Sequence, residues 1–339
     1  MAKSCANNLH GPTWLSWHWH QRTKAITREW GIEWIMLDTH RHGLARYVEL
    51  LGRSLKALWQ LRRSTVIVQS PSLLLATLAV AVAPALRLRL IIDAHNESVK
   101  PFAQDAAVVR QLIRLVVRRA EMVIVTNDEL AEIVRANYGR PFVLPDAIPV
   151  APPDDSRPPR CPLPVVLVIC TYAADEPVVA FIETARRLVG IAEVRLTGRP
   201  PSKAQDLLKS APDNLKPLGF LSESAYWAEL RNAQCVVDLT LKPNCLVCGG
   251  YEAIAVGKSP ILSDDVSGRR LFGGVATFVD NTVEGLTNAI LERLSGSEIP
   301  ADSIYGFRDQ YICQWRLRLA NLSSSLISPN QPHNEDLQS

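Results

Sequence analysis

The sequence lacks a hydrophobic run long enough to cross a bilayer as a helix, which needs about 20 residues. The longest apolar stretch, Leu73–Leu86, contains Thr77 and Pro84 and continues directly into Arg87. The first residues also lack the apolar segment of a secretory signal peptide. These absences argue against an integral membrane protein, and we expect a protein of the cytoplasm.

Sets of metal ligands are lacking as well. The cysteines are scattered and odd in number, at seven. Only Cys245 and Cys248 have CxxC spacing, and no second pair completes a zinc ribbon. The pairs His18-x-His20 and His40-x-His42 have no cysteine or carboxylate set nearby. We therefore expect reduced thiols, no metal and no bound cofactor.

The charge is unevenly distributed along the chain. Residues 1–150 contain 19 Lys and Arg against 12 Asp and Glu, whereas residues 151–339 contain 18 against 22. A basic first half can rest on an anionic membrane or attract an acidic substrate, although scattered solvated arginines would give the same count. The helix predicted over 106–120 has Arg110, Arg114 and Arg118 on one side, which fits a surface helix or a membrane-skimming one.

Short apolar runs alternate with helical patterns in the first half, which predicts a parallel sheet covered by helices. The expected strands are Trp34–Leu37, Thr65–Gln69, Leu88–Asp93 and Met122–Thr126, and the expected helices are Gln21–Trp30, Ala45–Leu61, Pro71–Ala83, Ala106–Ala120 and Asn127–Ala136. From Pro141 to Pro164 there are nine prolines and almost no periodicity, which indicates a semi-rigid linker.

The alternation restarts after the prolines. The expected strands are Val165–Cys170, Glu193–Thr197, Leu215–Leu218, Cys235–Leu239, Ser259–Leu262 and Thr277–Val279; the helices are Pro177–Val189, Ser202–Lys209, Ser222–Ala233, Tyr251–Val256 and Thr282–Leu294. The prediction is an α/β protein with two doubly wound, Rossmann-like domains facing a cleft. Their bounds are 1–145 and 165–300, with a linker at 146–164, a disordered tail at 326–339 and, within 301–325, a helix Gly306–Ser323 that crosses to the first domain. Ligands of such sheets bind beyond the carboxyl ends of the strands.

The segment NCLVCGGYEAIAVGKSPILSD, residues 244–264, is the strongest local signal. Gly249 and Gly250 are predicted to open the helix Tyr251–Val256, where backbone N–H groups favour an anion. Glu252 is placed in the first turn, where a carboxylate can accept hydrogen bonds from sugar hydroxyls. The combination indicates a nucleotide-diphosphate site, although Glu252 would also stabilise a helix N-terminus without any ligand.

Four stretches carry a resemblance to a known family: VIVTNDELAEIV, VLPDAIP, NLKPLGFLSESAYWAELRNAQCVVDLT and CGGYEAIAVGKSPILSD. The first two resemble the end of the first domain of family-4-like (group 1) GT-B glycosyltransferases, and the last two resemble the core of their donor domain. The resemblance covers most of residues 14–295. It implies the GT-B fold and transfer of a sugar from a nucleotide sugar.

The resemblance also implies roles for individual residues. Glu252 would contact the donor ribose, and the loop residues Cys245, Leu246, Gly249 and Gly250 would meet the sugar and diphosphate. Phe220 and Leu221 would hold the nucleobase, Gly198 and Arg199 would form a second donor loop, and Ser16, Trp17 and His18 would form an acceptor-side loop. His95 matches a histidine at the reaction centre.

Two features depart from the family pattern. Asn244 stands where the first glutamate of the E-x7-E motif is expected, and the basic residues that grip the diphosphate are missing near Thr171 and Val178. Arg199 or the helix N-terminus would then carry more of the diphosphate charge. These departures leave room for an inactive homologue.

Chemically, the transfer needs a stabilised leaving diphosphate and, for an inverted product, a base for the acceptor hydroxyl. His95 or Glu97 would take that proton, or His95 would position the donor sugar if configuration is retained. We predict a hexosyltransferase that builds a cell-surface polysaccharide on a glycan or polyprenyl-lipid-linked acceptor at the cytoplasmic face of the inner membrane, without nucleic acid as a partner. The alternatives are a catalytically inactive GT-B partner subunit and a nucleotide-sugar epimerase of the same architecture. A dinucleotide dehydrogenase is disfavoured because no G-x-G-x-x-G follows the first strand.

Overall fold

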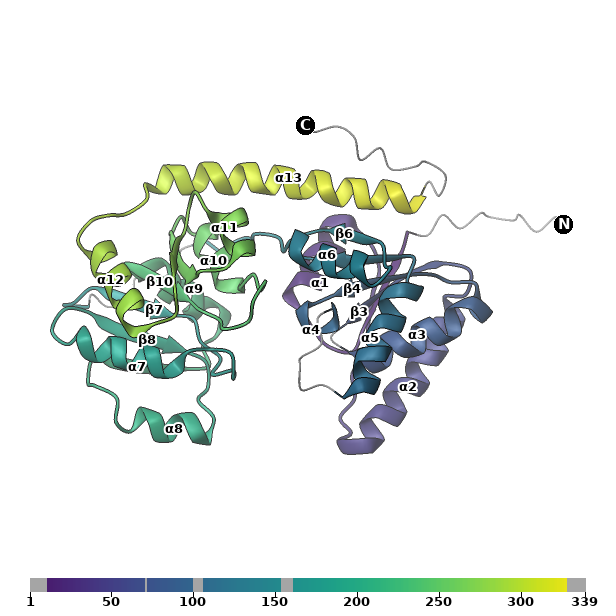
Figure 1. Cartoon of the computed structure of the whole chain (residues 1–339), viewed down its shortest axis with the longest axis horizontal. Helices are drawn as coiled ribbons and strands as arrows, with labels where there is room; N and C mark the ends of the chain where they lie inside the picture. Colours follow the sequence, from purple (N-terminus) through teal and green to yellow (C-terminus); the bar gives the residue numbers. More distant parts are fainter. Residues whose placement is uncertain (1–10, 71, 100–105, 154–160, 328–339) are drawn as a thin grey trace. The chain divides into compact units, whose positions relative to one another are not determined.

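The structure, a computed structural model, describes residues 11–70, 72–99, 106–153 and 161–327. The predicted disordered tail, apart from residues 326 and 327, lies outside the described residues, as does part of the proline-rich segment. The chain forms two compact units (Figure 1). Unit 1 comprises residues 1–147 and 314–339, and unit 2 comprises residues 148–313.

Unit 1 contains a parallel sheet in the order β2-β1-β3-β4-β5-β6. Its strands are β1 (Thr13–Ser16), β2 (Trp34–Met36), β3 (Thr65–Ser70), β4 (Arg89–Ala94), β5 (Met122–Val125) and β6 (Pro141–Val143). The central strands are buried apolar runs, because helices cover both faces of the sheet. The strand order reverses between β1 and β3, so the loops after these strands border the position where doubly wound sheets bind ligands.

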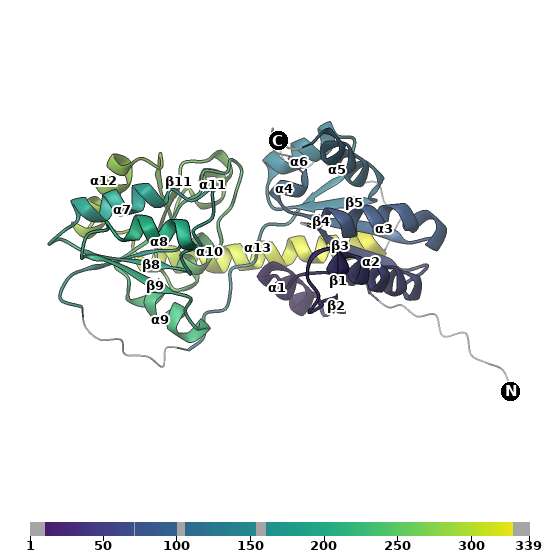
Figure 2. The same ribbon diagram turned by 90° about the horizontal axis from the view of Figure 1, so that it is seen from below.

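The helices of unit 1 follow the predicted alternation. They are α1 (Gln21–Trp30), α2 (Gly43–Gln60), α3 (Leu73–Leu86), α4 (Asn96–Val99), α5 (Ala107–Arg119) and α6 (Asp128–Ala136). Helix α3 packs against both α2 and α5 (Figure 2). Asn127 caps α6, since its side-chain oxygen accepts a 2.9 Å hydrogen bond from the Leu130 N–H.

Unit 2 contains a second parallel sheet, in the order β12-β11-β10-β7-β8-β9. Its strands are β7 (Val165–Val168), β8 (Glu193–Thr197), β9 (Leu215–Gly219), β10 (Cys235–Asp238), β11 (Pro260–Ser263) and β12 (Thr277–Val279), and its helices are α7 (Val178–Arg187), α8 (Ser202–Leu208), α9 (Glu223–Asn232), α10 (Cys248–Ala255), α11 (Val266–Phe272) and α12 (Val283–Leu294). The order reverses between β7 and β10, and the loops after these two strands therefore form the expected ligand edge. The two sheets confirm the prediction of two doubly wound α/β units.

The last helix, α13 (Ala301–Ile327), contributes to the core of both units. In unit 2, Tyr311 contacts the ring of Tyr251 with centroids 6.0 Å apart. In unit 1, the indole N–H of Trp315 donates a 2.9 Å hydrogen bond to the Pro145 carbonyl. The helix is longer at both ends than the predicted Gly306–Ser323, because apolar residues beyond those limits, among them Ile304 and Leu326, are also buried.

Several sequence-based boundaries were wrong. The proline-rich segment Pro141–Pro164, predicted to lack regular structure, begins with a strand, β6, whose Pro141 is tolerated because β6 is an edge strand and proline stands at its first position. Helix α3 continues through Pro84 to Leu86 rather than ending at Ala83. The short helices α4 and α11 and strand β1 were not among the predicted elements. No helix in the described part of the chain combines the length and the hydrophobicity needed to span a membrane.

Candidate functional site

The glycine pair of unit 2 lies inside a helix rather than before it. Helix α10 begins at Cys248, so Gly249 and Gly250 belong to its first turn, and Glu252 lies in the second turn and not in the first as predicted. The Gly249 N–H donates a 2.8 Å hydrogen bond to Oδ2 of Asp238, the last residue of β10. The Gly249 N–H, which the sequence analysis assigned to binding a ligand anion, is therefore hydrogen-bonded to a carboxylate of the protein itself.

Gly249 is required for its close packing. A Cβ atom at this position would lie 2.4 Å from Cδ1 of Ile169 and 2.5 Å from Oδ2 of Asp238. At Gly250 the nearest atoms, on Leu262 and Phe272, would be 3.5 Å away, which is ordinary contact. The lack of a side chain at Gly249 lets α10 approach the ends of β7 and β10. At Gly250 there is room for a Cβ atom, so packing does not require glycine there.

Glu252 is paired with Tyr226, which sequence reasoning did not single out. The Tyr226 hydroxyl, on α9, donates a hydrogen bond to a carboxylate oxygen of Glu252. Burial raises the pKa of Glu252, although the Tyr226 hydrogen bond opposes this shift. Burial, followed by the nearby Glu252 charge, also raises the pKa of Tyr226. The pair leaves a half-buried carboxylate held in one orientation beside the end of β10.

Asp238 adds a second perturbed carboxylate at this edge. Burial raises its pKa well above the usual range, and the charges of Glu252, Glu176 and Asp175 add to the shift, while the Gly249 N–H opposes it. A strongly shifted group at the point where strand order reverses is typical of a functional site, although structural networks produce such shifts too.

The loop after β7 is organised by Glu176. Its carboxylate accepts hydrogen bonds from the Thr171 N–H at 2.9 and 3.0 Å, the Thr171 hydroxyl at 2.8 Å and the Ala173 N–H at 3.1 Å. Backbone amides that gather on an anion in this way form a nest of the kind that binds phosphate. In this structure the anion is a side chain of the same loop.

The other predicted donor residues lie in loops at the same edge of the sheet. Asn244 adopts φ +59° and its N–H donates a 2.8 Å hydrogen bond to Asp265, which caps α11. Cys245 and Leu246 line a cavity of about 10 Å³, enough for one water molecule. Gly198 has φ +80°, and a Cβ there would lie 2.2 Å from the Cys170 carbonyl oxygen. The remaining predicted residues, Arg199 and Phe220, are exposed, and Leu221 is half-buried.

Neither cysteine of the CxxC pair, both of them in the described part of the chain, forms a disulfide. Burial raises the pKa of Cys245 to about 11, so its thiol is protonated at neutral pH. Among residues 11–70, 72–99, 106–153 and 161–327, no group of three or more His, Cys, Asp or Glu side chains could hold a metal ion.

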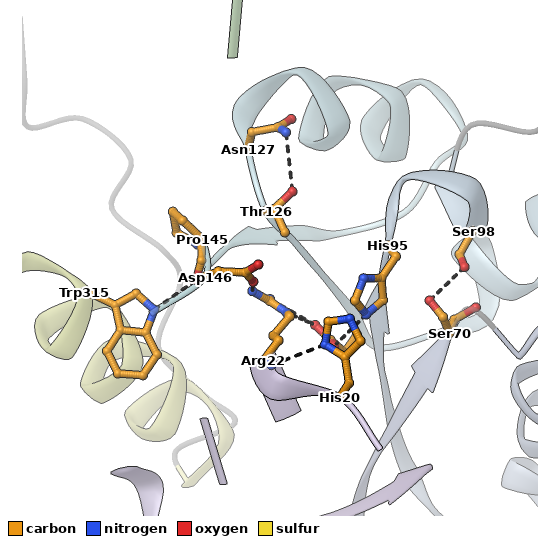
Figure 3. Close-up of polar contacts among 11 residues, drawn as sticks. His20, Arg22, Ser70, His95, Ser98, Thr126, Asn127, Pro145, Asp146 and Trp315 are labelled. Carbon is orange, nitrogen blue, oxygen red and sulfur yellow. Dashed lines mark hydrogen bonds and ion pairs between the residues drawn. The ribbon is translucent and has the colours of Figure 1, made fainter. Parts of the chain in front are cut away.

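In unit 1, a buried arginine lies between two carboxylates (Figure 3). Arg22 donates from Nε to Oδ1 of Asp93 at 3.0 Å and from Nη1 to Oδ1 of Asp146 at 2.7 Å. The Arg22 and Asp93 side chains are 2% and 0% exposed. Burial opposes the charge of Arg22, but the two carboxylates outweigh it and raise its pKa. Sequence reasoning missed Arg22 and Asp146, because no local pattern shows that α1, β4 and the segment after β6 meet.

His95 lies at the end of β4, directly beside this arginine network. Its Nε2 is 3.8 Å from Oδ2 of Asp93, and its ring packs edge-on against His20 with centroids 4.6 Å apart. His20 caps α1, since its Nδ1 accepts a 3.2 Å hydrogen bond from the Arg22 N–H. Burial, and then the neighbouring His95, lowers the pKa of His20, which is therefore neutral at neutral pH.

The backbone also holds His95 in place. Its N–H donates to the Ser70 carbonyl at 3.1 Å, and Ser98 donates from its hydroxyl to the same carbonyl at 2.8 Å (Figure 3). Glu97, the other predicted base, lies in the first turn of α4 with its side chain exposed. Of the two candidates, His95 is the less exposed.

The predicted acceptor-side loop is partly internal. Ser16 accepts a 2.9 Å hydrogen bond from the Trp34 indole and donates to the His18 carbonyl, and the Trp17 indole donates to Ser54 at 2.8 Å. Both Ser16 and Trp17 are buried, whereas the His18 side chain is exposed. Only His18 of this loop offers its side chain to solvent.

Comparison with known proteins gave matches in structure alone. No family model and no curated protein sequence matches the chain. The structure of Anabaena HepE in complex with UDP and glucose superposes with a TM-score of 0.71 at 12% identity, covering 93% of this chain and 100% of that one. Sucrose-phosphate synthase from Thermosynechococcus elongatus gives 0.70 at 13% identity, covering 94% and 100%.

An epimerase is also similar. The UDP-GlcNAc 2-epimerase from Methanocaldococcus jannaschii has a TM-score of 0.55 at 12% identity, covering 85% of this chain and 94% of that one. The higher scores belong to the glycosyltransferases. The two doubly wound units, with the strand orders described above, therefore have the GT-B fold.

Proposed function

We propose that this protein is a glycosyltransferase that moves a sugar from a nucleotide-diphosphate sugar to a glycan or lipid-linked acceptor. The observation that carries the proposal is the Glu252–Tyr226 pair beside the carboxyl end of β10, at the strand-order reversal of unit 2. A fixed, half-buried carboxylate is suited to accept hydrogen bonds from a ribose diol. HepE, with the same fold, was solved with UDP and with UDP-glucose, which makes uridine the first nucleotide to test.

In the proposed reaction, the bond between the anomeric carbon and the diphosphate breaks and the acceptor oxygen bonds to that carbon. The diphosphate departs with the bonding electrons, and the acceptor hydroxyl loses its proton. His95 is the group we assign to that proton if configuration is inverted. Its Nε2 faces Asp93, whose carboxylate would stabilise the imidazolium, and Nδ1 would accept the proton. With retention, His95 would position the donor sugar instead.

We further propose a hexosyltransferase of surface polysaccharide synthesis, acting from the cytoplasm at the inner membrane. The basic first half of the chain supports contact with an anionic surface. No metal is assigned to the reaction, so the backbone amides of the β7–α7 loop and Arg199 would carry the diphosphate charge.

One observation favours a second candidate, a GT-B subunit without turnover. The Glu176 carboxylate occupies the amides of Thr171 and Ala173, at the loop where the diphosphate would be held. A donor must displace this carboxylate or bind beside it. The epimerase alternative has support only from the lower-scoring structural similarity.

The test is thermal unfolding of the full chain with UDP, UDP-glucose, GDP and NAD, repeated on Glu252→Ala. A ligand at 100 times its Kd adds about 2.7 kcal/mol, or roughly 5–10 °C for units of this size. We expect a shift with one nucleotide diphosphate that is lost in Glu252→Ala and kept in the exposed control Glu284→Ala. No shift with any of the ligands would contradict the donor site, and a shift without sugar transfer would favour the subunit without turnover.

A further inference from the structure

Helix α2 exposes an apolar stripe to solvent. Leu44, Val48, Leu55 and Trp59 have exposed fractions of 79%, 63%, 46% and 60%. Their spacing of four, seven and four residues places them along one side of the helix. We call these four residues the α2 stripe. Large apolar side chains gathered in this way mark an interaction surface more often than single exposed ones do.

The stripe is separate from the face that packs on the sheet. Leu50, Ser54, Ala57 and Leu58 are the buried residues of α2 and form its contact with the core of unit 1. Helix α2 lies beside α3 (Figure 1). The helix therefore has two apolar faces, and the core needs only one of them.

The segment that contains the stripe is basic. Residues 36–63 contain six arginines and lysines against Asp38 and Glu49, a net charge of +4. Glu49 engages two of them, Arg41 and Arg53. The other four, Arg46, Lys56, Arg62 and Arg63, form no salt bridge with any residue that the structure describes. Lys56 lies about a quarter of a turn from the stripe and Arg62 follows its C-terminal end, whereas Arg46 lies on the opposite side of α2. We call Lys56 and Arg62 the basic flank; no described residue forms a salt bridge with either of them.

One of these cations lies beside an aromatic ring of the stripe. The Arg62 guanidinium lies 5.9 Å from the centre of the Trp59 ring. Tryptophan and arginine at the end of an apolar helix face are typical of the interface between lipid acyl chains and headgroups. An apolar stripe bordered by uncompensated cations complements an anionic bilayer, because acyl chains can bury the apolar side chains while anionic headgroups attract the cations. A purely apolar partner would provide no negative charge for these cations.

We infer that the α2 stripe and its basic flank form a docking surface for an anionic lipid bilayer, with α2 lying in the plane of the interface. Helix α5, the basic helix noted in the sequence, is the weaker candidate, because it exposes only Val108 and Leu115 as large apolar side chains. The inference rests on the membrane contact in the proposed function but is independent of the transfer reaction.

The test is co-sedimentation of the full chain with vesicles of phosphatidylcholine alone or mixed with phosphatidylglycerol. We expect binding to the anionic vesicles that weakens with added salt. Leu55→Ser/Trp59→Ser should reduce the partition coefficient at least about tenfold, from the loss of buried apolar area. Lys56→Gln/Arg62→Gln should reduce it about thirtyfold, given ~1 kcal/mol for each basic residue near the surface.

Val108→Ser/Leu115→Ser is the matched control on α5, and it should bind as the unchanged protein does. Equal binding by all variants, or a loss only in the α5 variant, would overturn the inference. If the α2 variants instead change the sedimentation coefficient without vesicles present, the stripe is a contact between copies of the chain and the inference is also overturned.

The same samples keep the two proposals distinguishable. Each variant is melted with and without UDP, because the α2 stripe lies in unit 1 and the Glu252 site lies in unit 2. If the α2 variants lose vesicle binding but keep the rise in melting temperature with UDP, the docking surface is supported. If they keep both vesicle binding and the rise with UDP, the docking surface is overturned and the donor site is not.

Discussion

Arg22 and Asp93 form a buried ion pair across 71 residues of sequence, with Arg22 Nε 3.0 Å from Asp93 Oδ1. Arg22 lies at the start of α1, and Asp93 belongs to the central strand β4. The pair connects the loop that carries His20 with the strand that carries His95. The positions of both histidines therefore depend on this contact.

Arg22→Met should destabilise unit 1 by about 3–5 kcal/mol, because it leaves the fully buried Asp93 without its partner. The free energy of unfolding in urea measures this loss. Arg135→Ala is the control, since the Arg135–Glu132 pair is exposed and should change the stability by less than about 0.5 kcal/mol. Similar losses in both variants would show that the buried pair has no special contribution.

Gly249→Ala and Gly250→Ala should behave differently although the residues are adjacent. The first substitution forces a Cβ against Ile169 and Asp238, and overpacking of this kind costs about 1–3 kcal/mol. The second meets only ordinary contacts, and replacing a helical glycine should be neutral or stabilise by up to about 1 kcal/mol. Urea unfolding of the two variants side by side gives the comparison, and an equal effect would contradict the packing.

Asp238→Asn should change the pH dependence of stability. Since the folded state raises the pKa of Asp238, its protonated form is favoured by folding. The contribution is present below the ordinary pKa of 3.8 and is lost as the pH rises through the folded value. The variant should therefore gain stability relative to the unchanged protein as the pH rises from about 4.

Urea unfolding between pH 4 and pH 8 tests this difference. Asp264→Asn is the control, because the hydrogen bond from Arg269 lowers the pKa of Asp264 below 3.8 and its contribution is lost only at more acidic pH, so its difference from the unchanged protein should stay constant over this range. A difference between Asp238→Asn and the unchanged protein that does not vary with pH would show that the Asp238 charge is not coupled to folding.

Glu176→Gln should strengthen nucleotide-diphosphate binding about tenfold, because it removes a negative charge that competes for the Thr171 and Ala173 amides. Calorimetric titration with UDP measures the Kd. Glu183→Gln, on the exposed side of α7, should leave the Kd unchanged. Weaker binding by Glu176→Gln would indicate that Glu176 itself contacts the donor.

His95→Ala should lower kcat for UDP release from the sugar donor by about 10²–10⁴-fold, the usual contribution of a general base. The thermal shift with UDP should remain, since the donor residues lie in unit 2. Glu97→Gln should change kcat by less than about threefold, because the Glu97 side chain is exposed. The reverse result would assign the proton transfer to Glu97.

The sequence by itself determined the alternation of strands and helices, and with it the two doubly wound units. Buried parallel strands must be short apolar runs, so local composition reveals them. Helix α1 was predicted with its observed bounds, and most other elements agreed to within one to three residues. The glycine at 249 was also recognised as significant, although its reason was not.

Only the tertiary structure decided which polar groups meet. The buried Arg22–Asp93–Asp146 network, the His20–His95 contact and the Tyr226–Glu252 hydrogen bond each join different elements of the fold. No periodicity records such distant pairs. The same holds for Gly249, whose lack of a side chain is required by the position of Asp238, a residue on a different strand. Local propensity specifies the elements, whereas the burial of charge specifies how their ends are arranged.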